Sequence, residues 1–199
     1  MSDNYVSSSA SNKWNISAGA CFILSVLSVI ALQQGVYSLG LGVYLQNPVY
    51  TFILVGQLVA AASFFSKNKI AVIVSAVILM LLYVAHLHFQ VVHFQLEGYD
   101  FADFYDLIDF LVFMGIPMSL SAIAYLLLAI VTGIGLTKKG GILGILPAML
   151  LFASMLVERD FLRSFYPMLQ IAISAFEILA LVFAGLWLPS VSKKKKADA

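Results

Sequence analysis

Six runs of apolar residues dominate this sequence, and every charged residue except Glu177 lies between these runs or in the two terminal segments. A helix needs about 20 apolar residues to cross the hydrocarbon core of a bilayer. The runs therefore predict an all-α fold: a polytopic membrane protein built as a six-transmembrane-helix bundle. The predicted helices cover residues 16–37, 49–65, 70–94, 110–136, 142–157 and 166–188.

The composition supports a chain that lies in lipid. Hydrophobic residues make up 62% of the sequence and charged residues 11%, whereas soluble domains carry about 25% charged residues. We therefore expect the lipid bilayer, and other membrane subunits, as partners. A net charge of +1 argues against nucleic acid, because proteins that bind nucleic acid are strongly basic. The single cysteine, Cys21, excludes an internal disulfide and a cysteine-based metal cage.

The lysines predict the orientation of the helices. Six crossings place all nine of them on one side of the membrane, and the positive-inside rule assigns that side to the cytoplasm. Both termini are then cytoplasmic, with an N-terminal segment 1–15, a membrane domain 16–189 and a basic tail 190–199. A model with only five crossings would place the fourth and fifth lysines of the chain on the opposite side of the membrane from the C-terminal tail. The lysines are Lys13, Lys67, Lys69, Lys138, Lys139 and those at 193–196.

The third run carries a stripe of polar residues. Spacings of three and four residues place them on one face of a helix. An unpaired polar group in hydrocarbon costs several kcal/mol, so this face should meet a helix interface or a water-filled cavity. The plainer alternative is that the histidines are hydrogen-bonded between packed helices. The stripe consists of Tyr83, His86, Gln90, His93 and Glu97.

Glu177 lies near the centre of the sixth run, with Gln170 on the same helical side. An ionisable residue inside a membrane span usually marks an ion pathway, a proton relay or a bound ligand. Gln33 and Gln34 occupy the outer part of the first run. We expect these groups and the helix-three stripe to share one outward-facing polar cavity, because clustering gives each polar group a partner.

The segment between the third and fourth runs alternates aspartates with aromatic residues. This pattern predicts a short interfacial helix with its carboxylates in water. The aspartates would form an acidic mouth that attracts cations to the cavity. Metal binding is the competing interpretation, but no calcium-binding loop pattern is present, and the metal content stays open. The four residues are Asp100, Asp103, Asp106 and Asp109.

Arg159 and Arg163 lie between the fifth and sixth runs, on the predicted outer side. Two arginines one turn apart can bind an anion, a lipid phosphate or a quinone headgroup. The simpler alternative is an ion-pair network with the neighbouring acidic residues.

Three functions fit these features. The first is a small transporter, channel or transport subunit that uses the polar cavity for protons or cations. The second is a redox subunit with haem or quinone, although His86 and His93 are about 10 Å apart along one helix and cannot clamp one iron. The third is an accessory or scaffold subunit of a larger membrane complex. No phosphate-binding loop, HExxH, CxxC or GxSxG motif occurs, so the sequence names no reaction and leaves open whether the protein is an enzyme.

Overall fold

The computed structural model describes residues 3–37, 48–134, 140–157 and 167–197, and this part of the chain is helical without any strand. The predicted all-α fold is confirmed at this level. The elements are α1 (Asp3–Tyr37), α3 (Pro48–Phe65), α4 (Lys69–Leu96), α5 (Phe104–Phe110), a π-helical turn η1 (Leu111–Gly115), α6 (Ile116–Ile134), α7 (Gly140–Val157) and α8 (Pro167–Ala197).

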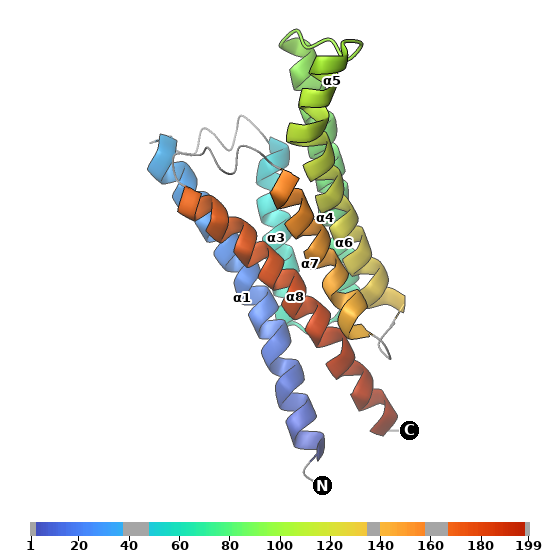
Figure 1. Cartoon of the computed structure of the whole chain (residues 1–199). Coiled ribbons are helices and arrows are strands. Elements are labelled where there is room, and N and C mark those ends of the chain that lie inside the picture. Colours follow the sequence, from blue (N-terminus) through green and yellow to red (C-terminus); the bar gives the residue numbers. More distant parts are fainter. Residues whose placement is uncertain (1–2, 38–47, 135–139, 158–166, 198–199) are drawn as a thin grey trace.

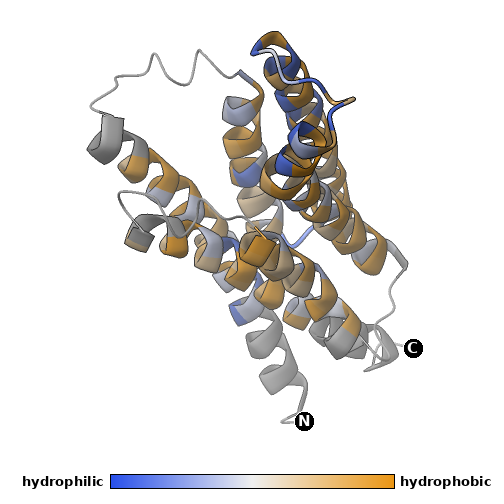
Figure 2. Ribbon diagram, turned by 45° about the horizontal axis from the view of Figure 1, so that its top comes forward, coloured by the Kyte–Doolittle hydropathy of each residue, from blue (hydrophilic) through white to orange (hydrophobic). Residues whose placement is uncertain are grey.

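Four helical segments are long and apolar enough to cross a membrane: Lys13–Leu32, Pro48–Phe65, Lys69–Leu96 and Phe104–Gly133. The described parts of α7 and α8 contribute shorter apolar segments, Leu143–Val157 and Ile171–Trp187. Figure 2 shows hydrophobic residues along most of the length of the helices and hydrophilic residues gathered around α5. Length and composition thus provide four candidate membrane spans.

The six long helical segments form a closed ring. Along this ring α1 contacts α3, α3 contacts α4, α4 contacts α6, and α6 contacts α7. α8 closes the ring because it contacts both α7 and α1. Successive members run in opposite directions, so the chain ends marked N and C lie together, at the opposite end of the bundle from α5 (Figure 1). We refer to these ends as the termini end and the α5 end.

A tightly packed apolar core fills the ring towards the termini end. The ring of Phe64 stacks on Phe22 with centroids 6.1 Å apart and meets the edge of Trp187 at 5.8 Å. Leu79 and Leu181 are also fully buried in this core. Aromatic pairs of this kind add to the free energy of apolar burial, so the termini end of the bundle is closed by side chains.

Glycine allows α7 and α8 to touch backbone to backbone. A Cβ atom built on Gly144 would lie 2.7 Å from the carbonyl oxygen of Gly185 and 2.8 Å from its Cα. Only residues without a side chain permit such an approach, and small residues at crossings are the usual way in which helices associate in lipid. This contact holds α8 close to α7 and so fixes the rotation of α8, which sets where its side chains point.

The interfacial helix expected before the fourth run is not a separate element. α5 exists, but the chain stays helical from Phe104 through η1 to Ile134. The π-helical turn directly precedes Pro117, whose missing N–H removes one helical hydrogen bond. Ser154 of α7 donates to the carbonyl oxygen of Pro117 at 3.1 Å. Pro117 therefore coincides with a local change of helical winding, and the helix continues past it.

Helical backbone also extends beyond the apolar runs at both chain ends. α1 begins at Asp3, well before residue 16, and α8 continues to Ala197 in the basic tail. The apolar runs predicted which residues suit the bilayer, whereas backbone hydrogen bonding can continue into polar sequence.

Candidate functional site

Three side chains from three helices donate to one oxygen atom of Glu177. Glu177 of α8 is only 8% exposed. Its Oε1 accepts hydrogen bonds from Gln57 Nε2 of α3 at 2.8 Å, Tyr83 Oη of α4 at 2.9 Å and Tyr125 Oη of α6 at 2.7 Å. A buried carboxyl group is stable in apolar surroundings when it is hydrogen-bonded in this way. We call these four residues the Glu177 cluster.

Packing orients the donors of the Glu177 cluster. The rings of Tyr83 and Tyr125 stack with centroids 5.5 Å apart and an interplanar angle of 16°. Tyr125 is completely buried and Gln57 is 3% exposed. No lysine or arginine within the described residues forms an ion pair with Glu177. The carboxyl group therefore has only neutral partners in this part of the chain.

A pocket of about 200 Å³ adjoins the Glu177 cluster, and both Glu177 and Tyr83 line it. Each of the six helical segments in the ring contributes to its wall, so the pocket lies at the centre of the bundle. Ten of the fourteen described lining residues are aromatic, aliphatic or thioether-bearing, and the other four are three serines and Glu177. The remaining lining residues are Leu32, Tyr50, Phe113, Met114, Pro117, Met118, Ser121, Leu151, Ser154, Met155, Ile173 and Ser174.

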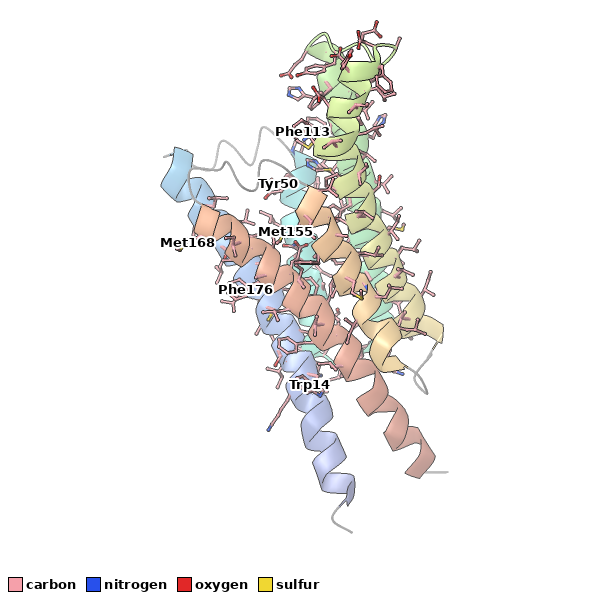
Figure 3. All side chains as sticks on the ribbon, in the orientation of Figure 1. Trp14, Tyr50, Phe113, Met155, Met168 and Phe176 are labelled. Atoms are coloured by element: carbon pink, nitrogen blue, oxygen red, sulfur yellow. The ribbon has the colours of Figure 1, made fainter. Side chains whose placement is uncertain are left out.

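The pocket extends from Glu177 towards the α5 end. Ile173 and Ser174 precede Glu177 on α8 in that direction, and Leu151 and Met155 lie in the half of α7 that ends there. Figure 3 shows Tyr50, Phe113 and Met155 in the half of the bundle nearer to α5, with Trp14 far towards the termini end. Glu177 thus forms the floor of a pocket that has packed core beneath it.

The predicted helix-three stripe divides into a buried and an exposed part. Tyr83 contacts Glu177, and His86, 5% exposed, lies one turn further, with its ring centroid 6.0 Å from that of Tyr50. His93 and Glu97 form a 3.2 Å ion pair with both side chains about half exposed. His93 is exposed and does not line the pocket, and the end of α4 that carries it extends past α3 towards α5 (Figure 1).

Gln90 is half-buried between these two parts of the stripe. His86 does not line the pocket, although Tyr50 beside it does, and its Nδ1 has no hydrogen-bond partner among the described residues. His88 and His93 are exposed. The structure therefore does not bring two histidines together around one site, as a haem iron with two histidine ligands would require.

The aspartates near α5 shape the local backbone. Asp103 caps α5 by accepting from the Tyr105 amide at 2.8 Å. Asp106 accepts from the Asp100 amide at 2.9 Å, and Asp100 accepts from Ala102 at 2.9 Å. Asp109 is exposed. None of the four aspartates lines the pocket, and the described residues contain no group of three or more possible metal-ligating His, Cys, Asp or Glu side chains.

Several predicted site residues fall beyond what the structure describes. The side chains of Gln33, Gln34 and Gln170 lie outside the described residues, as do Arg159 and Arg163 altogether. The predicted places of the three glutamines around the cavity and the predicted anion or quinone contact of the two arginines stay predictions.

Sequence reasoning missed two members of the Glu177 cluster, Gln57 and Tyr125. Gln57 carried a usable signal, since it is the only amide side chain in the run 49–65 and a lone amide in hydrocarbon needs a partner. Tyr125 carried none, because one tyrosine in a long apolar run is common near membranes. Comparison with known protein families, curated proteins and solved structures finds no significant match.

Proposed function

We propose that this protein is an integral membrane transporter that crosses the bilayer six times and carries protons or small cations through the central pocket. The closed ring of six helices supports the six crossings. α7, with 18 residues, would be about 27 Å long at 1.5 Å per residue, close to the roughly 30 Å of a hydrocarbon core. α8 is longer still, with 31 residues.

The distribution of charge supports an orientation with both termini in the cytoplasm. Lys67 lies in the turn between α3 and α4, and Lys69 is the first residue of α4, both at the termini end. The acidic segment 100–109 lies at the α5 end. Under the positive-inside rule the termini end faces the cytoplasm, and the pocket then faces outward.

The observation that carries the proposal is the position of Glu177 on the pocket floor. An ionisable residue at the middle of a membrane span costs about 2.5–3.5 kcal/mol on insertion scales. Three uncharged side chains donate hydrogen bonds to the carboxylate, and no lysine or arginine among the described residues pairs with it. A proton or cation that enters the pocket can therefore bind Glu177 and leave again.

The closed termini end supports a carrier in preference to an open channel. Phe22, Phe64 and Trp187 pack beneath the Glu177 cluster, and close packing of this kind excludes water. A cation bound at Glu177 would need a rearrangement of helices to leave on the other side. Alternating exposure of one central site is the usual principle of such carriers.

Proteoliposomes provide the test. The purified full-length chain is reconstituted with an entrapped pH-sensitive dye. Proton movement is recorded under a potassium diffusion potential, and after external addition of sodium or of an organic ammonium salt. We expect at least one condition to move protons faster than in protein-free liposomes. We expect Glu177→Gln to abolish that difference.

The matched control is Asp3→Asn, which removes a carboxylate at the first residue of α1 and changes the net charge equally. Its flux should equal that of the parent. Equal rates for the parent and Glu177→Gln under every condition would overturn the proposed transport role.

A further inference from the structure

The floor and the walls of the pocket differ in chemistry, and together they define a class of ligand. The floor presents one carboxyl group, that of Glu177, and the nearer wall presents the ring of Tyr83. Further out, the wall contains the rings of Tyr50 and Phe113 and the thioethers of Met118 and Met155. A single negative group at the end of an aromatic and apolar pocket is the expected complement of a cation that carries apolar groups.

We propose that the pocket binds a monovalent organic ammonium ion, with its nitrogen towards Glu177 and its apolar substituents against the aromatic and methionine walls. This inference rests on the proposed transport function, since it names the substrate class of the same site. Aromatic faces attract ammonium groups through the ring quadrupole, and the attraction increases when water is excluded. Methionine side chains adapt to irregular apolar ligands.

The donor set disfavours a divalent inorganic cation. Calcium requires six to eight oxygen ligands, and magnesium requires near-octahedral coordination. Among the described residues, Glu177 is the only acidic side chain that lines the pocket. Ser121 and Ser154 are bonded to each other at 3.3 Å, with Ser154 also donating to Pro117. An organic ammonium ion needs only the one carboxylate, because its own substituents replace the lost water with apolar contact.

The size of the pocket sets the size of the ligand. A volume of about 200 Å³ is small for a drug-sized molecule, whose sites span roughly 300–1,000 Å³. One aromatic ring with a substituted ammonium group is a suitable occupant. Benzyltrimethylammonium is therefore the probe, and neopentylbenzene is its neutral counterpart, because a carbon atom replaces the charged nitrogen in the same shape.

The experiment is equilibrium binding of radiolabelled benzyltrimethylammonium to the full-length protein in lipid nanodiscs. We expect saturable binding to the parent, at least about tenfold weaker binding to Glu177→Gln, and affinity within about twofold of the parent for the Asp3→Asn control. Neopentylbenzene should not displace the cation. Phe113→Leu, which removes one aromatic wall away from the hydrogen bonds of Glu177, should weaken binding about two- to fivefold.

Three results would overturn the inference: no saturable binding to the folded parent, equal binding to the parent and Glu177→Gln, or displacement by neopentylbenzene as effective as by the unlabelled cation. If Glu177→Gln does not fold, binding to Phe113→Leu becomes the deciding measurement. Binding to that variant as tight as to the parent would refute the contact of the ligand with the aromatic wall. Saturable binding without Glu177-dependent flux would contradict the proposed transport function, but it would still support the inferred class of ligand. Glu177-dependent flux without binding of benzyltrimethylammonium would contradict only the inferred class of ligand.

Discussion

The phenol rings of Tyr83 and Tyr125 stack 5.5 Å apart, and both hydroxyl groups donate to the same carboxyl oxygen. One tyrosine comes from α4 and the other from α6, so the shared acceptor on α8 ties three helices together. Because all three groups are buried or half-buried, loss of one donor cannot be fully replaced by water. The Glu177 cluster is therefore both a candidate binding site and a structural link in the bundle.

Tyr125→Phe tests that link. The variant keeps the stacked ring and removes the 2.7 Å hydrogen bond to Glu177. We expect the free energy of unfolding to fall by about 1–3 kcal/mol, the usual cost of removing one partner of a buried, charge-assisted hydrogen bond. The measurement is reversible denaturation in mixed micelles. Tyr105→Phe is the control, since Tyr105 is 77% exposed and its variant should match the parent; equal stability of the two variants would contradict the prediction.

Gly144→Ala tests the contact between α7 and α8. The new methyl group would meet the backbone of Gly185 at 2.7 Å, and a backbone atom cannot rotate away as a side chain can. We expect the helices to separate and the stability to fall by about 1–3 kcal/mol. Gly133→Ala is the control, because its methyl group would lie 3.6 Å from the Ile73 Cδ1 atom, an ordinary contact. If Gly144→Ala melts no lower than Gly133→Ala, the two helices do not pack as described.

Ser154→Ala tests the hydrogen bonds that join α7 to the turn around Pro117. The variant removes the donor to the Pro117 carbonyl and the partner of Ser121. We expect a loss of about 1 kcal/mol in the free energy of unfolding, typical of a buried neutral hydrogen bond. Ser66→Ala, at an exposed serine whose hydroxyl donates to the Ser63 carbonyl in its own turn, should change stability by less. An equal or smaller loss for Ser154→Ala would count against the contact.

Cysteine labelling tests the orientation in the membrane. Cys21 is the only cysteine and is buried, so a Cys21→Ser background leaves no native thiol. Single cysteines at exposed Ser66, in the turn between α3 and α4, and at exposed Tyr105, on α5, then report on opposite ends of the bundle. In intact cells a membrane-impermeant maleimide should label the cysteine of Tyr105→Cys. It should label the cysteine of Ser66→Cys only after the membrane has been permeabilised. The reverse pattern would invert the orientation, and equal labelling of both in intact cells would refute a membrane-spanning bundle.

Several properties of the molecule follow from its sequence alone. The apolar runs predicted every long helix, because a helix that faces lipid must be apolar along most of its length. Pro147 in the fifth run did not prevent α7 from forming. The isolated carboxyl group of Glu177 was recognisable as a candidate site, since an ionisable residue within a long apolar run is visible in the sequence and is expensive to place in hydrocarbon.

Tertiary structure alone decided which residues meet at Glu177. The spacing of Tyr83 and His86 predicted a common face of one helix, but a periodicity says nothing about the rotation of that helix against its neighbours. Packing turned Tyr83 onto Glu177, placed His86 one turn above the pocket floor, and left His93 in the exposed end of α4. Gln57 and Tyr125 lie 120 and 52 positions from Glu177 along the chain. Their convergence on one oxygen atom depends on the order of helices in the ring and on close approaches such as Gly144 to Gly185, which only the packed bundle defines.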